Sequence, residues 1–584
     1  ESYFSGNTVQ ICPVGALTGA AYRFRARPFD LVSTPSACEH CASGCDMRTD
    51  VRRGKTLRRL AGDDATVNEE WNCDKGRWAF KYVTSVDRLT TPLVRNSAGE
   101  LVAASWPEAL AAAAKGLKAS KAAVLVGGRA TYEDAYGYSK FARIALGTND
   151  IDFRSRLSSN EEREFLAARV VGSTTTYVDI DRADHVLLVG FEPEEESPIV
   201  FLRINKQVRK RALKVTAIAT KLSIGVEKLK GEFVKVAPGA EASAIASQSL
   251  TAKSVILVGE RAAESAGVLS AVAALADSTK AKIAWIPRRA GERGALEAGA
   301  IGNLLPGGRP VTDASARVDI AAVWGVDSLP SAEGKSAQEI YAAVNAGEIG
   351  ALLVGGVDPL DGDNSQGALA ALEKAFVVSL EIASSAVTQR ADVVLPVAAI
   401  TEKSGSFLNW EGRPRAFDTA VQDSLNRSDL RILSMIAEEM GATVNLATVT
   451  SAVKEIASLG KWDGARVSMS KVSASAQPAV SGDQFILTSW RRLLDLGTLQ
   501  QGEENLAGTA RATVAVISPK RASALGVVDG DKLKISTSLG SVTLNALVED
   551  IHDDALWAPR NSRGSQLLVN LGVAHGAVVS VVKA

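Results

Sequence analysis

The chain has 584 residues, which is too many for a single hydrophobic core, so we expect three or more domains. Its 66 basic and 66 acidic residues cancel, which gives no support for binding nucleic acid or an anionic membrane as the main activity. No stretch approaches the roughly 18 consecutive apolar residues of a transmembrane helix, so none is expected.

Five cysteines lie within the first 73 residues, and none follows. Cys38, Cys41 and Cys45 form a close triplet, and 27 residues separate it from Cys73. A [4Fe–4S] cubane takes one thiolate at each corner, so a triplet with one remote partner fits it. Zinc is the main alternative, although zinc sites usually arrange their ligands as two close pairs, and buried free thiols are a third interpretation. The clustering indicates a metal centre in a reducing compartment.

Cys12 stands apart from this set, in the run Ile11–Leu17. A Cys-Pro pair of this kind is typical of the last ligand of a cluster whose other ligands lie elsewhere. That role requires sequence upstream of Glu1, and a first residue other than Met favours a fragment of a longer chain. The alternative is a small, buried apolar residue.

Three other polar residues lie beside the cysteines. For His40, between two of them, we expect a hydrogen bond near the cluster rather than a role as ligand. Lys75 and Arg77 follow Cys73, and positive charge there would raise the reduction potential of a cluster. The alternative for this pair is a solvated basic turn.

From about residue 86, apolar runs alternate with helical segments. Ser105 and Glu108 form a capping box that predicts a helix from Glu108 to Lys118. Continuous apolar strands separated by helices indicate parallel sheets covered on both faces, over residues 86–460. The predicted strands are Ala122–Val126, His185–Val189, Ser254–Val258, Ile283–Ile286, Ala351–Val354, Phe376–Leu380 and Asp392–Leu395.

The two ends of the chain differ from this middle part. Residues 461–484 are rich in Ser, Ala, Gly and Val and lack periodicity, so we expect a linker. Over residues 485–584, closely spaced strands at Val514–Ile517, Lys532–Ser536 and Ser541–Val548 indicate a small barrel. At the front, we expect residues 1–34 to end a ferredoxin-like cluster segment and residues 35–85 to form the [4Fe–4S] domain.

Several motifs in combination resemble the molybdopterin oxidoreductase superfamily. They are the cysteine set with Cys73–Arg77, Asp87–Arg95, Trp106–Leu110, Ala391–Pro396, Glu402–Arg413 and Leu525–Asp531. The resemblance covers nearly the whole chain. It implies an α/β protein with an N-terminal iron–sulfur domain, central doubly wound parallel-sheet domains and a C-terminal double-psi β-barrel.

Within the superfamily, the chain is more similar to the large iron–sulfur subunits of bacterial NADH–quinone oxidoreductase (respiratory complex I) than to the catalytic enzymes. The Cys-Pro motif at Cys12 looks like the last ligand motif of a second cluster in those subunits. Where catalytic relatives carry a metal ligand, the stretch Ile151–Ser159 has no cysteine; Ser158 falls near that place, and Ser159 stands where formate dehydrogenases have His. A molybdenum- or tungsten-pterin oxidoreductase such as formate dehydrogenase is the alternative.

Electrostatics also argue against a bound pterin dinucleotide. The turn Gly190–Ser197 contains four glutamates, and carboxylates there would repel phosphates. We interpret this turn as the solvated acidic start of a helix. The run Gly355–Asp363 has glycines but three aspartates and no Lys or Arg, so it is weak as a phosphate loop.

The resemblance implies the following roles. Cys38, Cys41, Cys45 and Cys73 would hold one [4Fe–4S] cluster, and Cys12 would be the last ligand of a second, shared with an upstream segment that also carries a [2Fe–2S] cluster. No molybdopterin is expected. The chain would pass electrons from NADH and FMN toward quinone in a proton-translocating complex, with no catalytic residues of its own.

The same resemblance implies partners and a location. The partners would be a flavoprotein subunit that binds NADH and FMN, a [2Fe–2S] subunit, a two-cluster ferredoxin-like subunit and the subunits of the quinone site. The chain would lie in the peripheral arm, on the cytoplasmic side of the bacterial inner membrane, and would touch the membrane only through the complex. No nucleic acid is expected as a partner.

Overall fold

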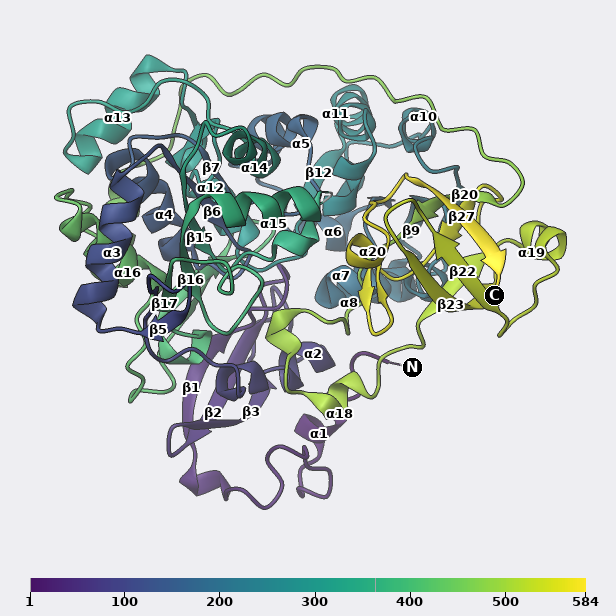
Figure 1. The fold of residues 1–584 in the computed structure, drawn as a ribbon. Helices are drawn as coiled ribbons and strands as arrows, with labels where there is room; N and C mark the ends of the chain where they lie inside the picture. Colours follow the sequence, from purple (N-terminus) through teal and green to yellow (C-terminus); the bar gives the residue numbers. More distant parts are fainter. Residues whose placement is uncertain (1, 363) are drawn as a thin grey trace. The chain divides into compact units, whose positions relative to one another are not determined.

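The computed structural model describes residues 2–362 and 364–584 and divides them into two compact units (Figure 1). The first unit comprises residues 2–156, 289–362 and 366–467, and the second is formed mainly by residues 157–288 and 468–584. None of the helices that the structure describes is long and apolar enough to span a bilayer.

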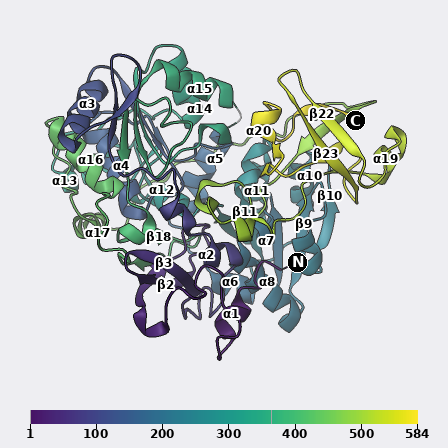
Figure 2. The same ribbon diagram turned by 60° about the horizontal axis from the view of Figure 1, so that its bottom comes forward.

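The first unit begins with a small antiparallel sheet, drawn in purple in Figure 1 and turned toward the viewer in Figure 2. Its strands are β1 (Val32–Ala37), β2 (Asp46–Arg52) and β3 (Lys55–Ala61), in the order β1-β2-β3. Short helices surround it: α1 (Asn7–Ile11), η1 (Pro28–Asp30), α2 (Asp74–Trp78) and η2 (Lys81–Thr84). The cysteine triplet lies in the connection between β1 and β2.

The larger part of the first unit is built on a seven-stranded sheet with the order β5-β4-β17-β16-β15-β6-β7. Strands β17, β16, β15, β6 and β7 pair in parallel, and β4 joins β17 in antiparallel fashion. The bounds are β4 (Leu93–Arg95), β5 (Leu101–Ala103), β6 (Ala122–Val126), β7 (Ile151–Asp152), β15 (Ala351–Gly355), β16 (Phe376–Glu381) and β17 (Val393–Pro396). Strands β6, β15 and β17 are buried throughout, as their continuous apolar runs predict.

Helices flank this sheet. The predicted capping box is confirmed, since the Ser105 and Glu108 side chains each accept from the other's backbone N–H at the start of α3 (Trp106–Lys118). The other helices and short elements of the unit are α4 (Tyr132–Ile144), α12 (Glu292–Glu297), β13 (Leu304–Leu305), η5 (Pro306–Gly308), β14 (Arg309–Pro310), α13 (Ala314–Trp324), α14 (Ala337–Asn345), η6 (Pro359–Asp361), α15 (Ser365–Lys374), η7 (Ile400–Glu402), β18 (Gly405–Leu408), β19 (Pro414–Phe417), α16 (Asp429–Glu439) and α17 (Val449–Ser458).

The second unit contains a five-stranded parallel sheet with the order β10-β9-β8-β11-β12. The chain moves from β8 outward to β10, then returns to place β11 on the other side of β8, which makes a switch point between β8 and β11. The elements are α5 (Asn160–Phe165), η3 (Leu166–Val170), α6 (Tyr177–Arg182), β8 (His185–Val189), α7 (Pro193–Glu196), α8 (Pro198–Arg211), β9 (Lys214–Ala219), α9 (Ile224–Lys228), β10 (Glu232–Lys235), α10 (Glu241–Ala246), β11 (Val255–Gly259), η4 (Glu260–Glu264), α11 (Val268–Thr279) and β12 (Lys282–Ile286).

The C-terminal part of the second unit is a closed six-stranded barrel with the order β20-β24-β21-β23-β22-β27. Its interior is apolar, and residues 459–483 before it contain no helix or strand. The elements are β20 (Gln484–Thr488), η8 (Thr498–Gln500), α18 (Glu504–Ala507), β21 (Val514–Ile517), α19 (Pro519–Leu525), β22 (Lys532–Ser536), β23 (Ser541–Val548), β24 (Ala555–Trp557), β25 (Asn561–Ser562), β26 (Ser565–Gln566), α20 (Leu567–Asn570) and β27 (Val578–Lys583). The prediction of an α/β protein with parallel sheets and a C-terminal barrel is confirmed.

Candidate metal centre

The structure gathers Cys38, Cys41, Cys45 and Cys73 in the interior of the N-terminal segment, with exposed fractions of 4, 8, 3 and 5 %. Cys38 directly follows β1, Cys45 directly precedes β2, and Cys73 caps the start of α2. The Cys38 N–H donates to the Cys45 carbonyl at 3.3 Å, which closes the loop that carries the triplet. Burial raises the pKa of Cys38 and Cys45; the Glu39 carboxylate and then the nearby thiols add to the rise at Cys38, and the nearby thiols add to it at Cys45. Burial and Cys41 raise the pKa of Cys73 to about 12.

Gly76 keeps space open beside two of these sulfur atoms, and Gly44 lies within the loop that carries the triplet. A Cβ added at Gly76 would lie 3.2 Å from the Cys38 Sγ and 3.8 Å from the Cys73 Sγ, so a side chain there would enter the space between the thiols. The Gly76 N–H also donates to the Cys73 Sγ at 3.4 Å. Gly44 has a φ of +78° beside Asn409, a conformation that favours glycine within the ligand loop. Four buried thiols around a space that admits no side chain fit a bound inorganic cluster.

Buried polar groups surround the thiols. Glu39, next to Cys38, accepts from the Arg59 Nη1 at 2.9 and 2.7 Å and from the Tyr82 hydroxyl at 3.0 Å. The His40 Nε2 lies 2.9 Å from the Ala79 carbonyl, so His40 makes the hydrogen bond expected of it, and burial lowers its pKa to about 4. Sequence reasoning missed the Arg59–Glu39 pair, because 20 positions separate the two residues.

Arg77 is fully buried, so the interpretation of its turn as a solvated basic one is wrong for this residue. Its guanidinium donates to the Asn7 and Asn72 side-chain oxygens, and burial lowers its pKa to about 10. Lys75, two residues earlier in α2, is partly exposed. The structure therefore places one buried and one partly exposed cation directly after Cys73.

Cys12 lies at the end of α1 and, unlike the four other thiols, is partly exposed. Backbone N–H groups, those of Leu17 and Val14 foremost, lower its pKa. Several large apolar side chains in the same stretch are exposed to solvent: Ile11, Val14, Leu17, Phe24, Phe29 and Val32.

Among residues 2–362 and 364–584, no three His, Cys, Asp or Glu side chains group closely enough to hold a single metal ion. A cubane requires a different arrangement of ligands, because each of its four irons takes one thiolate and the four thiolates surround a group larger than a single ion.

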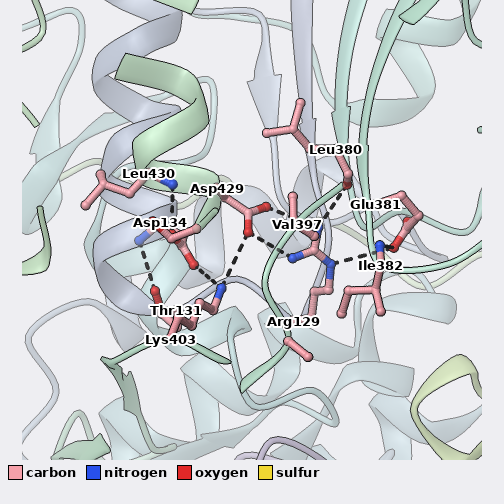
Figure 3. Close-up of polar contacts among 12 residues, drawn as sticks. Arg129, Thr131, Asp134, Leu380, Glu381, Ile382, Val397, Lys403, Asp429 and Leu430 are labelled. Carbon is pink, nitrogen blue, oxygen red and sulfur yellow. Dashed lines mark hydrogen bonds and ion pairs between the residues drawn. The ribbon is translucent and has the colours of Figure 1, made fainter. Parts of the chain in front are cut away.

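A second cluster of charged groups lies at the carboxyl ends of the strands of the seven-stranded sheet (Figure 3). Arg129, which follows β6, donates to both oxygens of Asp429 at 3.1 Å. The Lys403 Nζ lies 2.6 Å from Asp134 and 3.4 Å from Asp429, and Glu381 at the end of β16 lies 3.8 Å from the Arg129 Nε. Burial opposes ionisation of Asp429, yet Arg129 and Lys403 hold its pKa below the ordinary value.

Glycine turns at this same edge are filled by the chain's own atoms. A Cβ at Gly356 would meet the Arg129 Nε at 2.3 Å, and one at Gly355 would meet the Tyr138 hydroxyl at 1.9 Å. Tyr138 in turn donates to Asp429 at 2.8 Å. Open parallel sheets usually bind ligands at this edge, beside the switch point, which here lies between β6 and β15. The observed side chains occupy the turns against which a phosphate would have to lie.

The acidic turn Gly190–Ser197 of the second unit contradicts the sequence interpretation. Its four glutamates are between 1 and 6 % exposed, so the description as a solvated helix start is wrong. Tertiary contacts supply partners from distant positions, which sequence reasoning could not pair. The ion pairs join Glu194 to Lys228 and Arg511, Glu195 to Arg511, and Glu196 to Arg261.

The stretch that replaces the metal ligand of catalytic relatives has structural contacts. Ser159 caps α5 by accepting from the Glu162 N–H at 3.2 Å, and Ser158 is partly buried. In the first unit, Arg154 is fully buried and pairs with Asp152 at 2.9 Å.

Comparisons with known proteins agree with this organisation. Three family models match: the molybdopterin oxidoreductase Fe4S4 domain at residues 31–85, molybdopterin oxidoreductase at residues 88–439, and the Molydopterin dinucleotide binding domain at residues 485–581. The Fe4S4 match supports a [4Fe–4S] cluster in the segment that holds the four buried thiols.

Curated relatives cover the whole chain. It is 54 % identical over 600 residues to the G subunit of the NADH-quinone oxidoreductase of Mycobacterium tuberculosis, and 50 % identical over 621 residues to that of Streptomyces coelicolor. In both cases the alignment covers 100 % of this chain and 74 % of the relative. Among solved structures, acetylene hydratase from Pelobacter acetylenicus matches with a TM-score of 0.64 at 13 % identity, covering 94 % of this chain and 100 % of that chain, which shows the shared fold.

Proposed function

Because the chain belongs to the molybdopterin oxidoreductase family, in the branch formed by the G subunits of NADH-quinone oxidoreductase, we propose that it is an electron-transfer subunit of respiratory complex I. The observation that carries this function is the set of four buried thiols in the segment matched by the Fe4S4 domain. The site needs no general base or nucleophile, because its task is to hold a redox group in place.

Cys38, Cys41, Cys45 and Cys73 would hold one [4Fe–4S] cluster, which when bound takes up and releases single electrons. The chain's own residues do the rest. The burial of all four thiols excludes water, and the Cys38–Cys45 hydrogen bond closes the loop that carries the triplet. The buried guanidinium of Arg77 places positive charge beside Cys73, which favours the more negative, reduced state of a cluster.

We extend the proposal to Cys12 as the last ligand of a second [4Fe–4S] cluster, whose other ligands, together with a [2Fe–2S] cluster, would come from outside the described residues. Its partly exposed sulfur and the N–H groups that lower its pKa support this role, because metal ligation requires the thiolate. The exposed apolar side chains in the same stretch are consistent with a further protein surface covering it.

We also propose that the chain binds no molybdopterin. Support comes from the carboxyl edge of the seven-stranded sheet, where Arg129 and Tyr138, both hydrogen-bonded to Asp429, fill the glycine turns. A pterin with its phosphates would have to displace a charge network whose cations are already bound to carboxylates. The molybdenum- or tungsten-enzyme alternative is not favoured. Metal analysis tests this: one molybdenum or tungsten atom per chain would refute the proposal.

The relatives belong to NADH-quinone oxidoreductase, so other subunits of that membrane-associated complex are the partners of this chain. In finer detail, we propose the flavoprotein subunit with NADH and FMN, the [2Fe–2S] subunit, the two-cluster ferredoxin-like subunit and the quinone-site subunits as neighbours. The chain would lie in the peripheral arm on the cytoplasmic side of the inner membrane.

The cluster assignment is tested by Cys73→Ser in the full-length protein. Loss of one thiolate corner should lower the iron and acid-labile sulfide content and remove one paramagnetic signal of the reduced protein. Cys12→Ala is the matched control: it should leave the cluster of the buried thiols intact and remove only the iron in excess of one cubane. Unchanged iron and sulfide in Cys73→Ser, or stoichiometric zinc in the wild type, would refute the assignment.

A further inference from the structure

Arg59 of β3 is a fully buried cation whose hydrogen-bonding capacity is only partly used. Its Nη1 donates to both oxygens of Glu39, at 2.9 and 2.7 Å. Its Nε and Nη2 are also buried, and in the part of the chain that the structure describes they have no hydrogen-bond partner. An unpaired N–H of a buried guanidinium costs stability, because the group has lost its hydrogen bonds to water and gained none in the protein. A buried group of this kind points to a partner that the polypeptide itself does not supply.

The position of Arg59 identifies that partner as the candidate cluster. Glu39, to which Arg59 is fixed, immediately follows Cys38, and both residues are buried, with exposed fractions of 4 % each. Its neighbour Arg58 faces the other side of β3, where it binds Asp50 at 2.5 Å. Of these two adjacent arginines, the buried one therefore lies on the side of the thiols.

Charge balance leads to the same conclusion. Glu39 neutralises the charge of Arg59 but accepts hydrogen bonds only from its Nη1. The Nε and Nη2 groups of the guanidinium therefore remain able to interact with a second anion. Four thiolates on an iron cubane form a cluster with net negative charge, which becomes more negative by one on reduction. A fixed cation nearby stabilises the reduced form more than the oxidised form, because electrostatic attraction grows with the charge.

We propose that Arg59 is a positioning residue that raises the reduction potential of the cluster held by Cys38, Cys41, Cys45 and Cys73, with Glu39 fixing its guanidinium beside the thiols. This inference rests on the proposed cluster site. Strand β3 contributes no ligand to the cluster, but through Arg59 it would help to set the reduction potential of the cluster.

The test is a redox titration of the full-length protein, followed by the paramagnetic resonance of the reduced cluster. Arg59→Met should lower the ratio of reduced to oxidised cluster at the wild-type midpoint at least tenfold, which corresponds to a fall of at least about 59 mV in the one-electron potential. Arg59→Lys keeps the charge and should recover most of that potential. Arg58→Met removes the same formal charge from the opposite side of β3 and is the matched control, which should titrate like the wild type.

A second comparison removes the effect of leaving Glu39 buried without its cation. Glu39→Gln and the double variant Glu39→Gln/Arg59→Met differ only in the arginine, so a lower potential in the double variant isolates the contribution of Arg59. The same pair of variants tests the contribution of Arg59 if the single variant Arg59→Met does not fold. Equal potentials in the wild type and Arg59→Met, or in Glu39→Gln and the double variant, with iron content intact, overturn the inference and leave the proposed function standing. A wild-type protein without any cubane signal overturns both.

Discussion

Glu192→Gln is expected to remove a pH-dependent loss of stability from the second unit. Glu192 starts the acidic turn after β8 and is 4 % exposed. Its Oε1 has no hydrogen-bond partner among the described residues and lies over Gly225, where an added Cβ would come within 2.1 Å of it. The carboxyl group also borders a cavity of about 50 Å³ at the carboxyl edge of the five-stranded sheet.

Burial raises the pKa of Glu192 from 4.5 to about 8, and Glu195 and Glu196 of its own helix add to the rise. Two groups from other elements act in the opposite direction: the Ser223 hydroxyl before α9 and the Arg261 guanidinium of η4. The other titratable side chains that line the cavity are Lys221, Glu241 and His575.

The sign and size of the effect follow from proton binding. Between the ordinary value of 4.5 and about 8, the folded chain holds a proton on Glu192 that the unfolded chain has released, so stability falls as pH rises through this window. Each pH unit corresponds to about 1.4 kcal/mol, so the full penalty is of order 5 kcal/mol. Gln has the same shape and no charge to bury. The variant should therefore match the wild type near pH 5 and become progressively more stable up to about pH 8.

Hydrogen exchange of peptides from β8 and α8, measured between pH 5 and pH 9 after correction for intrinsic exchange rates, gives the local opening free energy. Glu227→Gln is the matched control, because Glu227 lies on nearby α9 and is exposed. That control should follow the wild type at every pH. A difference between Glu192→Gln and the wild type that stays constant from pH 5 to pH 9 would show that Glu192 is ionised in the folded state and would refute the reasoning.

Two further predictions concern the first unit, and urea unfolding checks both. Lys403→Met should destabilise the first unit by about 3 kcal/mol or more, because Asp134 and Asp429 would stay buried with one cation fewer beside them. A loss of stability below about 1 kcal/mol would contradict this account of the network. Gly127→Ala should cost at least as much, since the new Cβ would lie 1.8 Å from the Gly356 backbone oxygen, which no side-chain rotation can relieve; wild-type stability would contradict the close approach of the two turns.

The strands of both parallel sheets were predictable because burial on both faces requires a continuous apolar run. The runs Ala122–Val126 and His185–Val189 coincide with β6 and β8, and the run Ile283–Ile286 falls one residue short of β12. The four buried cysteines were likewise visible from their spacing, and the structure places all four in one small interior. These features depend on residue type and local order, which a sequence states directly.

The environment of the charged residues was not predictable in this way. The glutamates of Gly190–Ser197 looked like a solvated helix start, yet their cations come from positions as distant as Arg511. Arg59 and Arg58 are adjacent in sequence, and the strand pleat buries the first completely while the second remains partly exposed. Whether a charge is solvated or buried depends on which surfaces pack over it, and nothing in the local sequence records that.

The sequence by itself determined the class of fold, the positions of the strands and the identity of the candidate sulfur ligands, because apolar periodicity and cysteine spacing act through short-range geometry. Only the tertiary structure decided which charged side chains are withdrawn from water and what faces them: Arg59 beside the thiols, and Arg129 with Asp429 across the edge of the seven-stranded sheet. The physical reason is that the energy of a buried charge is set by partners brought together from distant parts of the chain, and these partners meet only when the chain has folded.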